Sequence, residues 1–161
     1  PEDSCTCRTS VGPFDGQGLP TEAFARIVDQ AKDAGVPRLH QLTIGVEGRG
    51  PTALKDARLL GLAIPQMGNA TYRIEYSLTC DFGPGESLNF SFSGSFERFK
   101  LVKSLQESVG PSASDIYVKM ILEATFESGL DIEGPQFLTI REVFSGFDFS
   151  RVHLVAEPKE E

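Results

Sequence analysis

Residues 71–93 read TYRIEYSLTCDFGPGESLNFSFS, and this stretch decides the fold. From 71 to 82 every second residue is apolar, and the residues between them are polar or charged. The Gly83-Pro84-Gly85 segment predicts a turn, after which the same alternation resumes over 88–93. A period of two is typical of a strand with one buried face and one wet face. The stretch therefore predicts a β-hairpin with its apolar side on the core and its polar side in water.

The segments around this hairpin alternate between helical and strand patterns. Apolar residues recur at i, i+3, i+4 and i+7 or similar spacings in four segments, which predicts helices over 20–34, 52–62, 96–105 and 135–147. Period-two alternation predicts further strands over 38–47, 115–127 and 151–157. The predicted order is thus α-β-α-β-β-α-β-α-β.

This order predicts an α+β fold. Residues 38–127 form a βαββαβ unit, the split-βαβ or ferredoxin-like arrangement. Because each predicted strand is apolar on one side only, we expect helices on a single face of the sheet. The result is a two-layer sandwich with a ferredoxin-like core, an extra N-terminal helix and a C-terminal α-β unit. We expect a flexible arm over 1–19, one domain over 20–157 and a charged tail over 158–161.

Composition and charge argue against several classes of function. The chain has 15 Lys and Arg against 23 Asp and Glu, a net charge of −8, so it should repel a nucleic-acid backbone. No apolar run reaches the length of about 20 residues that spans a bilayer, which predicts no membrane partner. Three cysteines are few for a secreted disulfide scaffold, so we expect a reducing, cytoplasmic location.

The first candidate site is a glycine-flanked arginine between a predicted strand and a predicted helix. Main-chain N–H groups at a helix N-terminus and a guanidinium can together hold an anion. Acylphosphatases share the βαββαβ order and also use an Arg loop at the first strand–helix junction, although their longer loop pattern is absent here. The alternative is a turn that needs glycine for its backbone angles. The candidate anion-binding residues are Gly48, Arg49, Gly50 and Thr52.

The second candidate is the Cys5-Thr6-Cys7 segment. Zinc sites use Cys-x2–4-Cys spacing and need four ligands, so this pair is shorter than the zinc pattern and lacks a second pair. It is a remnant of a metal knuckle or a plain terminal segment. The sequence contains no GxxxxGK[ST], GxSxG or HExxH motif, so we expect no cofactor and no catalytic residue.

Several stretches together resemble a known kind of protein region. Those stretches are 57–66 (ARLLGLAIPQ), 72–75 (YRIE), 96–103 (FERFKLVK), the 118–126 strand and 134–141 (GPQFLTIR). They look like the C-terminal region of large prokaryotic AAA-type ATPases of unknown function, which are often found near restriction and defence genes. In those chains the nucleotide-binding motifs lie far upstream, and a cysteine knuckle can precede the region.

The resemblance implies an accessory domain that contacts partner proteins or the ATPase body. It agrees with a chain that starts at Pro1 rather than Met, which we interpret as a domain of a longer protein or a processed product. We therefore expect a non-enzymatic protein-interaction domain. Two alternatives stay open: an anion-binding domain or acyl- or phosphoryl-transfer enzyme that uses the Arg49 loop, and an oligomerisation domain that pairs through an edge strand or the open sheet face.

Overall fold

The computed structural model describes residues 13–66, 70–99, 113–147 and 151–158. They form an α+β fold around a six-stranded sheet with the strand order β1-β6-β2-β5-β3-β4, in which every neighbouring pair is antiparallel. The strands are β1 (Phe14–Gly18), β2 (Arg38–Arg49), β3 (Thr71–Gly83), β4 (Glu86–Ser95), β5 (Asp115–Asp131) and β6 (Arg151–Glu157). The helices are α2 (Pro20–Asp33), α3 (Gly50–Ala63), the short 3₁₀ helix η1 (Ile64–Gln66), α4 (Phe96–Phe99) and α6 (Pro135–Ser145).

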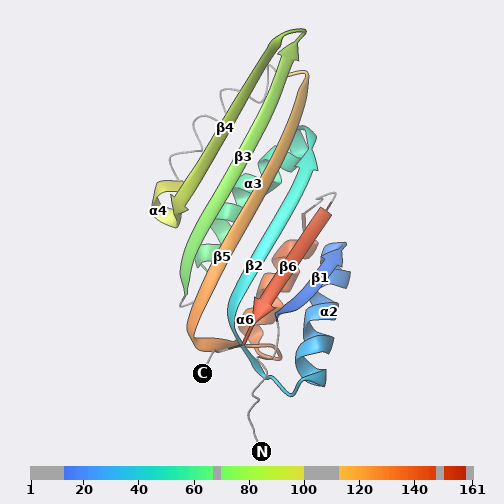
Figure 1. Ribbon diagram of the computed structural model, residues 1–161, viewed down its shortest axis with the longest axis vertical. Helices are drawn as coiled ribbons and strands as arrows, with labels where there is room; N and C mark the ends of the chain where they lie inside the picture. Colours follow the sequence, from blue (N-terminus) through green and yellow to red (C-terminus); the bar gives the residue numbers. More distant parts are fainter. Residues whose placement is uncertain (1–12, 67–69, 100–112, 148–150, 159–161) are drawn as a thin grey trace, which may run out of the picture.

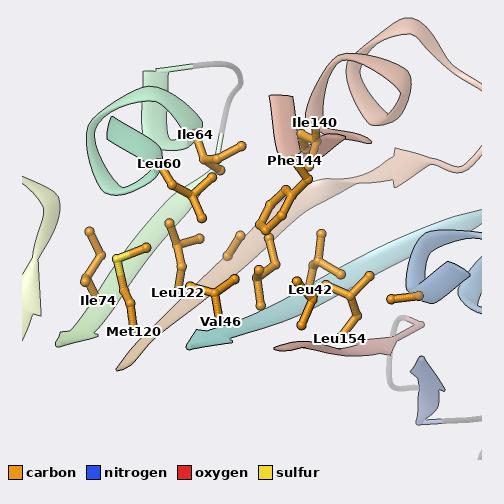
Figure 2. Packing of buried hydrophobic residues seen from close by; sticks show 14 of the residues in the cluster. Leu42, Val46, Leu60, Ile64, Ile74, Met120, Leu122, Ile140, Phe144 and Leu154 are labelled. Atoms are coloured by element: carbon orange, nitrogen blue, oxygen red, sulfur yellow. The ribbon is translucent and has the colours of Figure 1, made fainter. Parts of the chain in front are cut away.

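The helices cover one face of the sheet, as the one-sided strand pattern predicts. In Figure 1 the open face of the sheet points toward the viewer, and α3 and α6 lie behind it. Figure 2 shows the core between these layers, with Leu60 and Phe144 reaching down from the helices toward Val46 and Leu122 on the strands. None of the described helices is long and apolar enough to cross a bilayer.

The hairpin that decides the fold is confirmed. On β3 the residues from Thr71 to Cys80 alternate between a wetter and a buried side, and Tyr76 opposite Phe92 lies within the β3–β4 register. The buried side carries Ile74, Leu78 and Cys80, all without exposed surface. Burying one such aliphatic side chain contributes about 1.5–3 kcal/mol to folding, so the alternation fixes which side of the hairpin faces the helices.

The βαββαβ order is present, but the ferredoxin-like strand arrangement is not confirmed. That arrangement would place β2 and β4 side by side at the centre of the four strands. The centre is instead β5 beside β3, with β2 outside β5 and β4 outside β3. β5 has alternate residues buried along nearly its whole length, whereas no residue of β4 is fully buried. The apolar strand therefore lies inside, where both edges are paired, and the serine-rich strand lies at the edge.

The predicted arm over 1–19 ends earlier than the sequence suggested. Residues 14–18 form β1, which pairs with β6 from Phe14 opposite Ala156 to Gly18 opposite Val152. Two glycines in five residues hide the period-two pattern, and the pairing partner lies far away in the sequence, so no local signal predicts this strand. Residues 1–12 and the predicted tail beyond 158 lie outside the described residues.

Candidate functional site

The Arg49 loop lies where β2 passes directly into α3. Gly48 is buried and pairs with Val118 of β5, while Arg49 is the extended residue that precedes the helix. Gly50 has a φ of 94°, in the left-handed region that favours glycine, so the sharp entry into α3 requires it. Thr52 is exposed in the first turn, and the Arg49 side chain makes no capping hydrogen bond to this helix end. The four residues predicted from the sequence are thus together at one corner of the fold.

The Arg49 guanidinium is already engaged by groups of β5. Its Nη1 lies 2.9 Å from Oδ2 of Asp115, and its Cζ lies 5.1 Å from the centre of the Tyr117 ring. The Tyr117 hydroxyl in turn donates to Oε1 of Glu47 at 3.0 Å. The sequence did not point to Asp115 or Tyr117 as neighbours, because 66 residues separate Arg49 from Asp115 and only the β2–β5 register brings them together.

This arrangement is a surface ion pair with a cation–π contact. The side chains of Arg49 and Asp115 are 66% and 50% exposed, so the pair contributes at most about 1 kcal/mol to stability. An incoming anion would meet the Asp115 carboxylate and would have to displace it from the guanidinium. The anion-binding loop stays a prediction, and this geometry does not strengthen it.

A titration with inorganic phosphate tests that prediction. If the loop binds anions, phosphate raises the melting temperature of the wild-type chain, and the increase disappears in Arg49→Ala. An Asp115→Asn variant should then respond more strongly, because the competing carboxylate is gone. We expect no increase in any of the three proteins.

The cysteine candidate cannot be placed on the fold. Cys5 and Cys7 lie outside the described residues. Within the described ranges, no three His, Cys, Asp or Glu side chains are grouped as metal ligands. Cys80 is fully buried on β3, and burial raises the pKa of its thiol, so it is a packing residue rather than a reactive one.

The open face of the sheet carries a shallow depression over β4, β3 and β5. Its volume is about 340 Å³, and it is open rather than enclosed. The residues around it are Glu75, Tyr76, Ser77, Ser91, Phe92, Ser93, Lys119 and Ile121. A depression this shallow, with hydroxyl groups and a single charge of each sign, does not define a small-molecule site, since such sites enclose most of their ligand.

The β1 edge of the sheet is closed by α2. Gln30 of α2 accepts a hydrogen bond from the Asp15 main-chain N–H at 3.1 Å and donates one to the Asp15 carbonyl at 2.6 Å. The Asp15 side chain accepts a third from Nε2 of His153 on β6, at 2.8 Å. Gly16 packs so tightly under α2 that a Cβ there would overlap the carbonyl oxygen of Ala23. Another strand therefore cannot pair at Asp15 without displacing Gln30.

The β4 edge at the other side of the sheet is built differently. Among the described residues β4 pairs only with β3, and Figure 1 shows it as the outermost strand opposite β1. Residues 87–95 contain no charged residue and no proline, and the one register irregularity lies beside the turn, between Asp81 and Gly83. Proteins usually protect long edge strands with lysine, proline, bulges or a covering element. Over 87–95 the described part of the chain provides none of these.

The side chains of β4 fall into two rows. On the open face they are exposed and short: Ser87, Asn89, Ser91, Ser93 and Ser95. On the helix side Leu88, Phe90 and Phe92 are half-buried against the core. The Phe90 ring is 6.4 Å from that of Tyr76, and the Phe92 ring is 6.0 Å from that of Phe99. The strand is therefore held in an extended conformation while part of its apolar surface stays in water.

Comparison with protein-family models, curated proteins and solved structures returned no match to this chain.

Proposed function

We propose that this chain is a protein-interaction domain rather than an enzyme, and that a partner protein binds by adding a strand to the outer edge of β4. One observation supports the proposal: in the described part of the chain, the two edges of the same sheet differ in whether a side chain hydrogen-bonds to their outer main-chain groups. Gln30 occupies the main-chain groups of Asp15 at the β1 edge, whereas 87–95 stays uncharged and unpaired on its outer side within the described residues.

Strand addition suits the groups that β4 offers. Main-chain N–H and C=O groups along an edge supply affinity to any extended peptide, and side chains on alternate positions supply selectivity. Here the half-buried row of Leu88, Phe90 and Phe92 would contact alternate residues of the added strand. Such a partner is a segment with period-two apolar residues.

The Arg49 loop supports a catalytic function less well. Its guanidinium is held by Asp115 and lies over the Tyr117 ring, so the positive charge already interacts with protein groups. A nucleophile or general base would need to lie within about 3 Å of a reacting group, and the groups nearest to Arg49 are its own structural partners.

Selection of peptides from a random displayed library against the chain tests the proposal. We expect the recovered peptides to have alternating apolar residues and, once bound, to slow amide exchange specifically in β4. An Arg49→Ala variant should bind them as well as wild type, because the loop is on another strand. Recovery of no peptide, or protection confined to α3 or to the depression on the open face, would contradict the proposal.

On the resemblance described above, we further propose that the domain is an accessory part of a larger ATPase-like protein. The reading frame upstream of the codon for Pro1 tests this directly. A nucleotide-binding motif in the same frame supports the proposal, and a frame that encodes no such motif overturns it.

A further inference from the structure

We infer that the partner of the β4 edge is β4 of a second copy of this chain, paired antiparallel about a two-fold axis at Ser91. This inference rests on the proposed function, because it names the protein that the edge accepts. It would join the two sheets into one continuous sheet.

The charge distribution favours a second copy at this place. Two chains that each carry −8 repel one another over most of their surfaces. Residues 87–95 are a run of nine residues without charge, and they lie at the outer limit of the sheet. Two copies can therefore meet along this run with less repulsion than a charged face would cause.

The pattern of β4 is complementary to itself. When Ser91 lies opposite Ser91, Phe90 lies opposite Phe92 and Ser87 lies opposite Ser95, so the whole uncharged segment is used. Registers centred on other residues pair fewer of these nine residues. Each half-buried Phe then gains an aromatic neighbour across the interface, and cross-strand aromatic pairs are among the stabilising pairs in antiparallel sheets. Glu86 falls opposite Phe96 and not opposite a second Glu86.

The exposed side chains of β4 on the open face of the sheet form a second set of contacts across the interface. Asn89 lies opposite Ser93 and Ser91 opposite itself, and all of these side chains are exposed in the single chain. Short hydroxyl and amide groups can hydrogen-bond across the new strand pair. A charge placed at Ser91 therefore lies directly opposite the same charge in the second copy, so two identical chains repel at that point whatever the sign of the charge, and only chains with opposite charges there attract each other.

Sedimentation equilibrium of the full chain over a wide concentration range tests the inference. We expect a monomer–dimer equilibrium for wild type. Ser91→Lys and Ser91→Glu should each raise the dissociation constant about fivefold or more, because like charges then lie opposite each other on paired strands. An equimolar mixture of the two variants should dimerise at least as well as wild type, since the lysine introduced in one chain then faces the glutamate introduced in the other.

The control variant is Thr125→Lys on β5. Thr125 is exposed on the same open face, and its neighbours across the sheet are Gln41 and Thr71. The Thr125→Lys variant changes the net charge from −8 to −7, as Ser91→Lys does. It should therefore leave the dissociation constant of the dimer unchanged or lower it. Circular dichroism of all variants checks that the sheet is intact.

Two results would overturn the inference. One is a wild-type chain that stays monomeric at the highest concentration reached. The other is a dimer that Ser91→Lys and Ser91→Glu do not weaken, because it then uses another surface. Neither result decides the proposed function, because the peptide selection shows independently whether β4 accepts a strand from any partner.

Discussion

At Tyr72 the fold buries a polar group at a cost in stability. Its side chain is 8% exposed, its ring packs edge-on against Phe126, and its hydroxyl is buried without a hydrogen-bond partner among the described residues. A buried polar group without a partner costs about 1–3 kcal/mol of desolvation. The same burial raises the pKa of this hydroxyl.

Replacing Tyr72 with Phe should therefore raise the free energy of unfolding, by about 1 kcal/mol. Urea denaturation at neutral pH measures the change. Tyr117→Phe is the matched control: it removes a hydroxyl that donates to Glu47, so it should lower stability by about 0.5–1 kcal/mol. A loss of stability in Tyr72→Phe would contradict this description of the hydroxyl.

The Asp15 carboxylate gives the chain a residue-scale response to acid. The hydrogen bond from His153 holds the pKa of Asp15 below its usual value of 3.8. A carboxylate with a lowered pKa in the folded state stabilises the fold above the pKa of the unfolded chain, and this contribution is lost as the pH falls through the folded pKa. We expect wild type to lose more stability than Asp15→Asn as the pH falls from about 5 through 3.8 to about 2. Parallel slopes of stability against pH for the two proteins would contradict this role.

At the scale of elements, the β1–α2 contact is what closes the β1 edge of the sheet. Gly16→Ala should destabilise the chain by about 3 kcal/mol, because the new methyl group would overlap the Ala23 carbonyl and push α2 away from β1. Gly45→Ala on β2 is the control, since the nearest atom to its added Cβ is 3.6 Å away. Thermal melts of both variants test this, and equal changes would show that α2 does not press on β1.

The sequence predicted elements with a regular period far better than it predicted pairing. Alternation located the strand over 151–157 without error and the hairpin within a few residues. It missed β1, whose Gly16 and Gly18 break the pattern. It also predicted that β5 would stop at Glu127, whereas the strand continues to Asp131 beyond a register shift at the level of Leu39 and Gln41. Local periodicity reports which side of a strand is buried, and it carries no signal for irregular pairing.

In the candidate site, too, the sequence predicted local features and missed contacts that depend on strand pairing. The sequence correctly put Gly48, Arg49, Gly50 and Thr52 between a strand and a helix, because glycine and proline mark such junctions. It did not predict that Asp115 would neutralise Arg49, since that contact depends on which strand lies beside β2. It also could not distinguish edge strands from central strands, and the proposed function depends on that distinction.

At the scale of the whole molecule, one edge of the sheet is closed by α2, and within the described residues the other edge is open for pairing. Amide hydrogen exchange measured at low and high protein concentration tests it most directly. At low concentration the Asp15 amide should exchange slowly, held by Gln30, while alternate amides along 87–95 exchange fast. At high concentration those β4 amides should become protected and the rest of the sheet should not change. Protection of those same alternate β4 amides already at low concentration, or new protection that appears away from β4, would contradict the account.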